Sequence, residues 1–247
     1  KISLTWELDP IQLSSLTFLP FNKPRTPSIK RVGPHTIDIL SIFICSLLGD
    51  GHASKDPRGN GTVFRFYYSA INIEYTLYLH QLISNLGNCS PNIPVVRTRI
   101  IKNYYYPETA KVIPALSKNS TRGIIRFNSF TYSSFNWIHE AFYLNNVKRI
   151  PDFIGDYLTP QGLAIWIMDD GNYITNRGLR ISTYSFNYNE VLFLSELLNS
   201  KYGLKTNLQS GGIDNTYVIY ISKTSLNDLI EIVKPFMVKS MLYKLGL

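Results

Sequence analysis

Two apolar stretches stand out in this sequence, Phe43-Ile-Cys-Ser-Leu-Leu-Gly-Asp-Gly51 and Leu163-Ala-Ile-Trp-Ile-Met-Asp-Asp-Gly171. Each predicts a buried helix that stops at an Asp-Gly pair. An aspartate at this position opposes the partial negative charge of the helix C-terminus, at a cost of ~0.3–1 kcal/mol. Asp-Gly is also an ordinary turn dipeptide, but its recurrence after two buried helices favours a functional role for Asp50 and Asp170.

The rest of the chain repeats one order of elements. Apolar periodicity and turn residues predict helix, hairpin, helix, hairpin, helix, and then the same order again. Residues 69–87 align without a gap with residues 185–203, at an offset of 185 − 69 = 116. The sequence therefore predicts an α+β fold of tandem pseudosymmetric αββαββα repeats with antiparallel sheets. The expected helices span residues 37–48, 73–86, 133–144, 161–168, 189–202, 226–233 and 238–245.

The repeat divides the chain into three parts. Residues 34–150 form the expected first half and residues 151–247 the second. Residues 1–33 are rich in proline and basic residues and show neither a helical nor a strand period. They are expected to form an extended basic arm, with an inert tail or the remnant of an upstream fusion as alternatives.

The composition points to a polyanionic partner. The 247 residues include 25 Lys and Arg against 17 Asp and Glu, for a net charge of +8. Charge alone leaves a basic protein without a nucleic-acid role equally open. The two isolated cysteines, Cys45 and Cys89, predict neither a disulfide framework nor a cysteine zinc site. No secretory signal and no apolar run of ~18 residues is found, so no membrane association is expected.

Two carboxylates at adjacent helix ends create a charge conflict. They repel each other unless a proton or a cation lies between them. A hard divalent cation resolves the conflict, and oxygen ligands of this kind suit Mg²⁺. Asp169 is a second carboxylate in the later stretch, but the repeat aligns it with Gly49, which makes Asp170 the partner of Asp50.

These residues carry a family resemblance. The two opening stretches resemble the two LAGLIDADG motifs of the homing endonucleases. Tyr157-Leu-Thr-Pro160, Met168-Asp-Asp-Gly171 and Met241-Leu-Tyr-Lys-Leu245 are similar to the mitochondrial intron endonucleases of that family. The resemblance covers about residues 36–245, although the first stretch keeps only its final Asp-Gly letter for letter.

The resemblance implies a site-specific endonuclease that cuts both strands of double-stranded DNA in intron homing. The motif helices would pack at the pseudo-dyad, and the sheets would form two saddles over the major groove. Asp50 and Asp170 would hold the metal that activates water, with the backbone carbonyls of Gly49 and Asp169 completing the coordination. Lys148 would be the active-site lysine of the first half.

Lys244 would be the lysine of the second half, where it neutralises charge on the phosphate. The expected metal is Mg²⁺, with Mn²⁺ able to replace it and Ca²⁺ binding without turnover. Because one chain carries both motifs, we expect a monomer that needs no protein partner. The richness in Asn, Ile, Tyr, Lys and Phe resembles mitochondrial coding and suggests a mitochondrial location.

The predicted strands carry rows of basic and polar side chains. Arg, Asn and Gln can read base edges in the major groove. A merely solvated sheet face would mix in acidic residues, and these rows carry almost none. The candidates for DNA contact are Arg65, Tyr67, Ser69, Arg97, Arg99, Asn103, Arg126, Asn128, Arg180, Ser182, Tyr184, Asn207, Gln209, Tyr217 and Tyr220.

Two other functions are weighed against the nuclease. The same basic sheets could bind intron RNA in a maturase, and some proteins of the resembled family act in this way. The paired aspartates favour the nuclease, because an RNA chaperone does not need them. A glycosidase with two carboxylates is the second rival. The basic strands and the repeat-related positions of the acids argue against it.

Close packing of the two motif helices needs small residues. The first helix offers Cys45, Ser46 and Gly49, whereas the second offers Gly162 and Ala164. The second helix then continues with the bulky Trp166. The sequence therefore predicts an asymmetric interface between the two helices.

Overall fold

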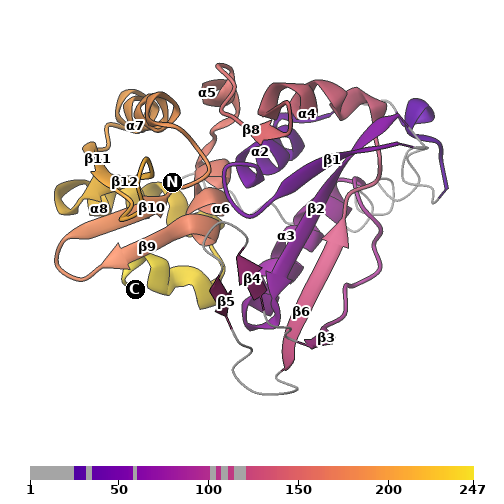
Figure 1. Cartoon of the computed structure of the whole chain (residues 1–247), viewed down its shortest axis with the longest axis horizontal. Helices are drawn as coiled ribbons and strands as arrows, with labels where there is room; N and C mark the ends of the chain where they lie inside the picture. The colour runs from indigo at the N-terminus through magenta and orange to yellow at the C-terminus, as the bar shows by residue number, and fades with distance from the viewer. Residues whose placement is uncertain (1–24, 32–34, 58–59, 101–103, 107–110, 114–120) are drawn as a thin grey trace, which may run out of the picture.

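Two four-stranded antiparallel sheets, one in each half of the chain, form the framework of the protein (Figure 1). The computed structural model describes residues 25–31, 35–57, 60–100, 104–106, 111–113 and 121–247. The strand order is β1-β2-β6-β3 in the first sheet and β11-β12-β10-β9 in the second. Helix α3 packs against the first sheet and α7 against the second, and helices α2 and α6 pack against each other.

The first half contributes both long strands and short ones. Its main strands are β1 (His52–Asp56), β2 (Gly61–Ser69), β3 (Arg97–Ile100) and β6 (Thr121–Asn128). Its short pairs are β4 (Tyr104–Tyr106) with β5 (Lys111–Ile113) and β7 (Tyr143–Leu144) with β8 (Val147–Lys148). Its α-helices are α2 (Ile37–Ser46), α3 (Ile73–Asn85) and α4 (Asn136–Phe142), and its 3-10 helices are η2 (Ser28–Lys30), η3 (Ala70–Asn72) and η4 (Ser133–Phe135).

The second half repeats this order. Its strands are β9 (Gly171–Ile174), β10 (Gly178–Ser182), β11 (Thr206–Ser210) and β12 (Tyr217–Ser222). Its α-helices are α5 (Ile154–Tyr157), α6 (Pro160–Asp170), α7 (Tyr188–Tyr202) and α8 (Leu226–Val233), and its 3-10 helices are η5 (Lys223–Ser225), η6 (Lys234–Phe236) and η7 (Lys239–Leu245). The α+β repeat predicted from the sequence is therefore confirmed.

Several helix ends differ from the prediction. Helix α2 ends at Ser46 rather than at residue 48, because the chain folds back so that the Gly51 N–H donates to the Ser46 carbonyl at 2.9 Å. Helix α6 continues two residues further than expected, to Asp170. The helix expected over residues 133–144 begins as a 3-10 turn and ends at Phe142. The chain then forms the hairpin of β7 and β8, whose turn residues Asn145 and Asn146 have positive φ.

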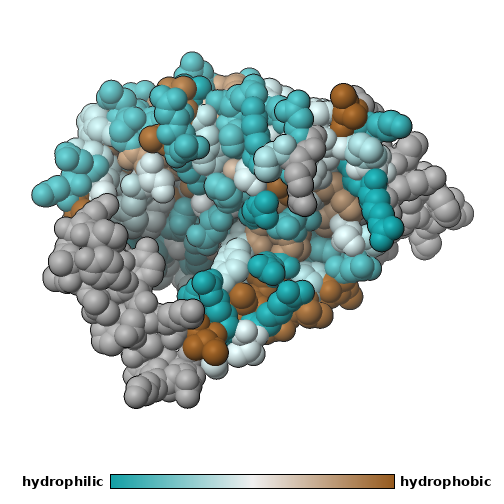
Figure 2. Space-filling model, turned by 45° about the vertical axis from the view of Figure 1, so that its right-hand side comes forward, coloured by the Kyte–Doolittle hydropathy of each residue, from teal (hydrophilic) through white to brown (hydrophobic). Residues whose placement is uncertain are grey.

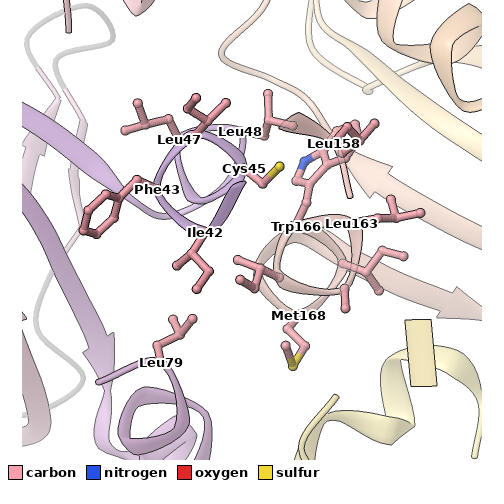
Figure 3. Packing of buried hydrophobic residues seen from close by; sticks show 14 of the residues in the cluster. Ile42, Phe43, Cys45, Leu47, Leu48, Leu79, Leu158, Leu163, Trp166 and Met168 are labelled. Carbon is pink, nitrogen blue, oxygen red and sulfur yellow. The ribbon is translucent and has the colours of Figure 1, made fainter. Parts of the chain in front are cut away.

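Helices α2 and α6 pack closely, and small residues make this possible (Figure 3). A Cβ placed on Gly162 would lie 2.5 Å from the Cys45 sulfur and 2.7 Å from the Ser41 hydroxyl. The Ser41 and Thr159 hydroxyls share a 2.6 Å hydrogen bond across the same contact. Trp166 of α6 is fully buried, and Figure 3 shows its side chain near Cys45 and Leu158, so the bulky residue is accommodated in the core; an asymmetric interface stays a prediction.

Part of the proline-rich N-terminal region is packed against the first half. Arg31 is 3% exposed, and its guanidinium lies 4.0 Å from the centre of the Phe130 ring. The described residues 25–31 therefore pack against the fold rather than extend from it, whereas residues 1–24 and 32–34 lie outside the described part. None of the described helices is long and apolar enough to cross a bilayer.

Gly162→Ala should destabilise the protein, because its methyl group would overlap Cys45 and Ser41. We expect the free energy of unfolding to fall by about 1–3 kcal/mol. Gly155→Ala is the matched control, because its Cβ would meet only the flexible end of Leu197, at 3.1 Å. Chemical denaturation of the two variants measures the difference, and equal stability would contradict the close packing.

Candidate active site

Asp50 and Asp170 lie in different local structures. Helix α6 remains helical through Asp170. Helix α2 ends at Ser46, so Asp50 follows a turn in which the Gly49 N–H donates to the Ser46 carbonyl at 3.2 Å. The backbone of Asp170 is therefore held by helical hydrogen bonds, whereas the backbone of the equivalent Asp50 lies beyond the end of its helix.

The two carboxylates are electrostatically coupled. Burial and then the charge of Asp50 raise the pKa of Asp170 to about 7, against the opposing effect of Lys244 and Lys148. Burial also raises the pKa of Asp50, and the Lys244 and Lys148 ammonium groups oppose this effect. Each carboxylate is therefore harder to ionise than an ordinary aspartate, mainly because of burial, and at Asp170 the charge of Asp50 adds the like-charge repulsion expected from the sequence.

One lysine from each half approaches this pair. Lys148 Nζ donates to the Gly49 carbonyl at 3.2 Å, and Lys244 Nζ donates to the Asp169 carbonyl at 2.7 Å. Burial lowers the pKa of both lysines, and the nearby aspartates partly restore it. The structure thus brings together the two lysines and the two carbonyls that the sequence singled out.

The Asp169 side chain has a position that the sequence did not reveal. It is partly buried, and its Oδ1 accepts hydrogen bonds from Tyr75 Oη at 2.8 Å and Tyr68 Oη at 3.1 Å. Its Oδ2 accepts the Asp50 N–H at 3.2 Å. Burial and the charge of Asp50 raise the pKa of Asp169, whereas the tyrosine hydrogen bonds lower it. Only its carbonyl had been a candidate ligand.

The donor set fits a divalent cation that is shared with a substrate. Among the described residues, no group of three or more His, Cys, Asp or Glu side chains could hold a metal ion. Two carboxylates next to two backbone carbonyls are instead a partial set of hard oxygen donors. Mg²⁺ commonly binds to one or two carboxylates and takes its remaining ligands from water and substrate phosphates.

The first sheet gathers arginines on one face. Cross-strand register places Arg65 opposite Asn128, Tyr67 opposite Arg126, and Arg97 opposite Ile124. Because directly opposite residues share a face, these side chains and Ser69 line the same surface. Asn103 lies outside the described residues. A hollow of about 510 Å³ lies on this side, lined by Asp50, His52, Arg65, Phe66, Tyr67, Arg126, Phe127 and Asn128.

Two residues of this face were missed from the sequence. Arg122 lies opposite Arg99, and both arginines hydrogen-bond the Tyr67 hydroxyl, which lowers the pKa of Tyr67. The Arg99 bond is 3.1 Å long. His52 of β1 lies directly opposite Arg65 of β2 and therefore shares its face of the sheet. The alternation that selected Arg126 and Asn128, continued four residues back, would have found Arg122.

The second sheet carries a mostly uncharged polar face. Arg180 lies opposite Asn172 on one side and Tyr220 on the other, and Asn207 follows opposite Tyr220. By the same alternation Ser182 and Gln209 share this face, and Tyr184 lies just beyond the strand, where it is 46% exposed. Asn172 was missed from the sequence. Figure 2, in which the right-hand side of Figure 1 is turned forward, shows hydrophilic side chains over most of the coloured surface of the molecule, with smaller apolar patches between them.

The expectation for Tyr217 was wrong. It is three residues from Tyr220 on β12, so its side chain points to the opposite face of the sheet. There its ring packs edge-on against Tyr188 of α7, with 5.0 Å between the ring centroids. Tyr217 therefore belongs to the contact between sheet and helix rather than to the open face.

Comparison with known proteins identifies relatives over most of the chain. The sequence pattern of the LAGLIDADG DNA endonuclease family matches residues 40–229. The cytochrome b mRNA maturase bI2 of Saccharomyces cerevisiae is 41% identical over 222 residues, which cover 87% of this chain and 49% of the maturase. The intron-encoded endonuclease ai4 of Dictyostelium discoideum is 39% identical over 170 residues, which cover 68% of this chain and 99% of ai4.

A solved structure shares the fold. The homing endonuclease I-WcaI, bound to its DNA recognition sequence, matches with a TM-score of 0.71 and 23% identity, over 95% of this chain and 97% of that one. The chain spans about half the length of the Saccharomyces maturase, so the match does not extend to that whole protein.

Asp170→Asn should stabilise the metal-free protein at pH 8. The pKa of Asp170 rises from an ordinary 3.8 to about 7 on folding, so the folded state retains a proton that the unfolded state loses between these values. Stability is therefore lost as the pH rises toward 7, and Asn removes this cost. We expect a higher Tm than wild type at pH 8 and a smaller difference at pH 5.

The exposed Asp156 of α5 provides the control, because Asp156→Asn should leave the Tm unchanged at both pH values. Adding a divalent cation should then raise the Tm of the wild type more than that of Asp170→Asn. A Tm for Asp170→Asn that is equal to or below the wild-type value at pH 8 would contradict the charge conflict.

Proposed function

The chain belongs to the LAGLIDADG DNA endonuclease family, and on this premise we propose that it cuts both strands of a specific DNA site. One observation carries the proposal. The paired carboxylates Asp50 and Asp170, each beside a lysine, lie at the ends of two central helices. The open faces of two polar sheets extend from this centre, so it lies where a bound duplex would cross between them.

Different residues of the chain would bind the metal and the phosphate. Asp50 and Asp170, with the carbonyls of Gly49 and Asp169, would hold divalent cations, for which we propose Mg²⁺. Such an ion makes bound water a better nucleophile and neutralises charge on the phosphate. Lys148 and Lys244 are partly desolvated, which strengthens their attraction for phosphate oxygens in the transition state.

The two sheet faces would hold different halves of the DNA site. The first face carries Arg65, Arg97, Arg99, Arg122 and Arg126. Arginine pairs well with guanine and with phosphate, whereas the amides of Asn207 and Gln209 on the second face suit adenine. We therefore propose a long asymmetric site that a single chain recognises without a second protein. I-WcaI, which shares the fold, was solved with its DNA recognition sequence.

A maturase function is the second candidate. It is favoured by the 41% identity to a cytochrome b mRNA maturase, and its partner would be the chain's own intron RNA. The nuclease is preferred because both aspartates are present and coupled at the helix ends. The similarity to cytochrome b maturases, together with the composition, also supports a mitochondrial location.

Asp50→Asn and Asp170→Asn should each abolish double-strand cleavage, because each removes one negatively charged oxygen ligand. We expect a loss of roughly 100-fold or more, measured as conversion of a target plasmid to the linear form in Mg²⁺. Binding to the same site in Ca²⁺ should persist. Asp169→Asn should reduce cleavage far less, and full activity in either of the first two variants would refute the assignment.

DNA affinity should fall steeply with salt, because arginines replace the counterions of the backbone. The slope of log affinity against log salt should be about −0.9 for each neutralised phosphate. Arg126→Ala should reduce this slope, whereas Asn207→Ala should leave it unchanged. A flat response would contradict DNA binding through this face. If intron RNA competes better than the DNA site, the maturase function is the correct one.

A further inference from the structure

The backbone of Asp50 depends on a contact from the opposite half of the protein. The equivalent Asp170 is the last residue of a continuous helix, so its position is set by helical hydrogen bonds. Asp50 comes four residues after the end of α2. Its N–H donates to the Asp169 carboxylate, which the second half contributes, at 3.2 Å.

The Asp169 carboxylate is in turn fixed by the first half. Tyr68 is on β2 and Tyr75 is on α3, and their hydroxyls donate to the same carboxylate oxygen at 3.1 and 2.8 Å. Tyr75 is fully buried and Tyr68 is 3% exposed, so solvent does not replace these bonds. Three donors therefore hold the Asp169 carboxylate, and one of them is the backbone of Asp50.

The contact has no mirror image on the other side of the pseudo-dyad. The residue equivalent to Asp169 is Gly49, which has no side chain to offer. A Cβ on Gly49 would lie 2.5 Å from the Asp169 Cβ, so the space is already filled by Asp169. The Asp50 backbone thus receives a side-chain hydrogen bond for which Gly49 offers Asp170 no counterpart.

We propose that Tyr68, Tyr75 and Asp169 are positioning residues that fix the Asp50 backbone. Because the second centre uses only the backbone carbonyl of Asp169 and neither tyrosine, loss of these three side chains should impair mainly the Asp50 centre. The catalytic consequence rests on the proposed nuclease function. Weakening this support should convert a double-strand cutter into an enzyme that nicks one strand.

Hydrogen exchange tests the support without DNA, metal or activity. The variant is Tyr75→Phe, and the control is Tyr78→Phe, which removes a hydroxyl from the same helix that donates instead to the Phe236 carbonyl at 3.0 Å. The Asp50 amide should exchange about tenfold faster in Tyr75→Phe, as expected for one lost hydrogen bond. In Tyr78→Phe it should be unchanged. Equal exchange of this amide in both variants would overturn the proposal.

Strand-resolved cleavage tests the consequence. On a plasmid that the wild type linearises, Tyr75→Phe should accumulate nicked circles, because cleavage of one strand slows roughly tenfold or more while the other strand is cut at the wild-type rate. The nick should always lie in the same strand. Asp169→Ala, which removes both carboxylate oxygens that accept these hydrogen bonds, should also nick.

A merely structural role predicts a different result. Equal slowing of both strands in Tyr75→Phe, or linearisation at the wild-type rate, would overturn the proposal. Tyr78→Phe should linearise the plasmid as the wild type does, even if its Tm falls. A wild type that cuts no DNA site would refute the nuclease function, and the exchange of the Asp50 amide would then decide the positioning role by itself.

Discussion

Close contact between helices α2 and α6 is the constraint on which the rest of the structure depends. Gly162 allows α6 to approach Cys45 and Ser41, and Gly49 allows the approach of Asp169. Because the helices run side by side to a common end, their final carboxylates must share one small and partly buried space. Any side chain larger than hydrogen at these two glycines would force the helices, and therefore the carboxylates, apart.

That closeness creates an electrostatic strain which the surroundings only partly relieve. Burial raises the pKa of both Asp50 and Asp170, the charge of Asp50 raises that of Asp170 as well, and Lys148 and Lys244 lower both. The folded protein would be more stable if the two carboxylates lay further apart, because like charges repel. Keeping the two carboxylates together is useful if a positive ion binds between them. A polyanionic substrate at the same centre would bring further negative charge, which a positively charged surface nearby would have to neutralise. The arginine-rich face of the first sheet provides such a surface.

Much of this architecture could be predicted from the sequence, because it follows from short-range periodicity. The two Asp-Gly stretches and the recurring order of elements predicted the pseudosymmetric α+β fold, and alternation placed Arg65, Tyr67 and Ser69 in one row. The same rule, applied strictly, would have excluded Tyr217, which is an odd number of residues from Tyr220. That correction was therefore available before the structure.

The role of the Asp169 side chain could not be predicted in this way. Its partners Tyr75 and Tyr68 are 94 and 101 residues away in the chain, and Asp50 is 119 residues away. Periodicity within one element carries no information about such contacts. The end of α2 at Ser46, two residues before the predicted end, could not be predicted either, because it depends on how tightly Gly51 folds back against Ser46. The asymmetry between the two carboxylates thus emerges only from packing between the halves.

We propose that one chain holds both catalytic carboxylates and is sufficient to cut both strands. Sedimentation of the protein bound to a cleavable duplex tests it most directly. The account predicts one chain per duplex at an asymmetric site, with both strands cut when Mg²⁺ is added. Two chains per duplex, or a strict preference for a palindrome, would contradict it.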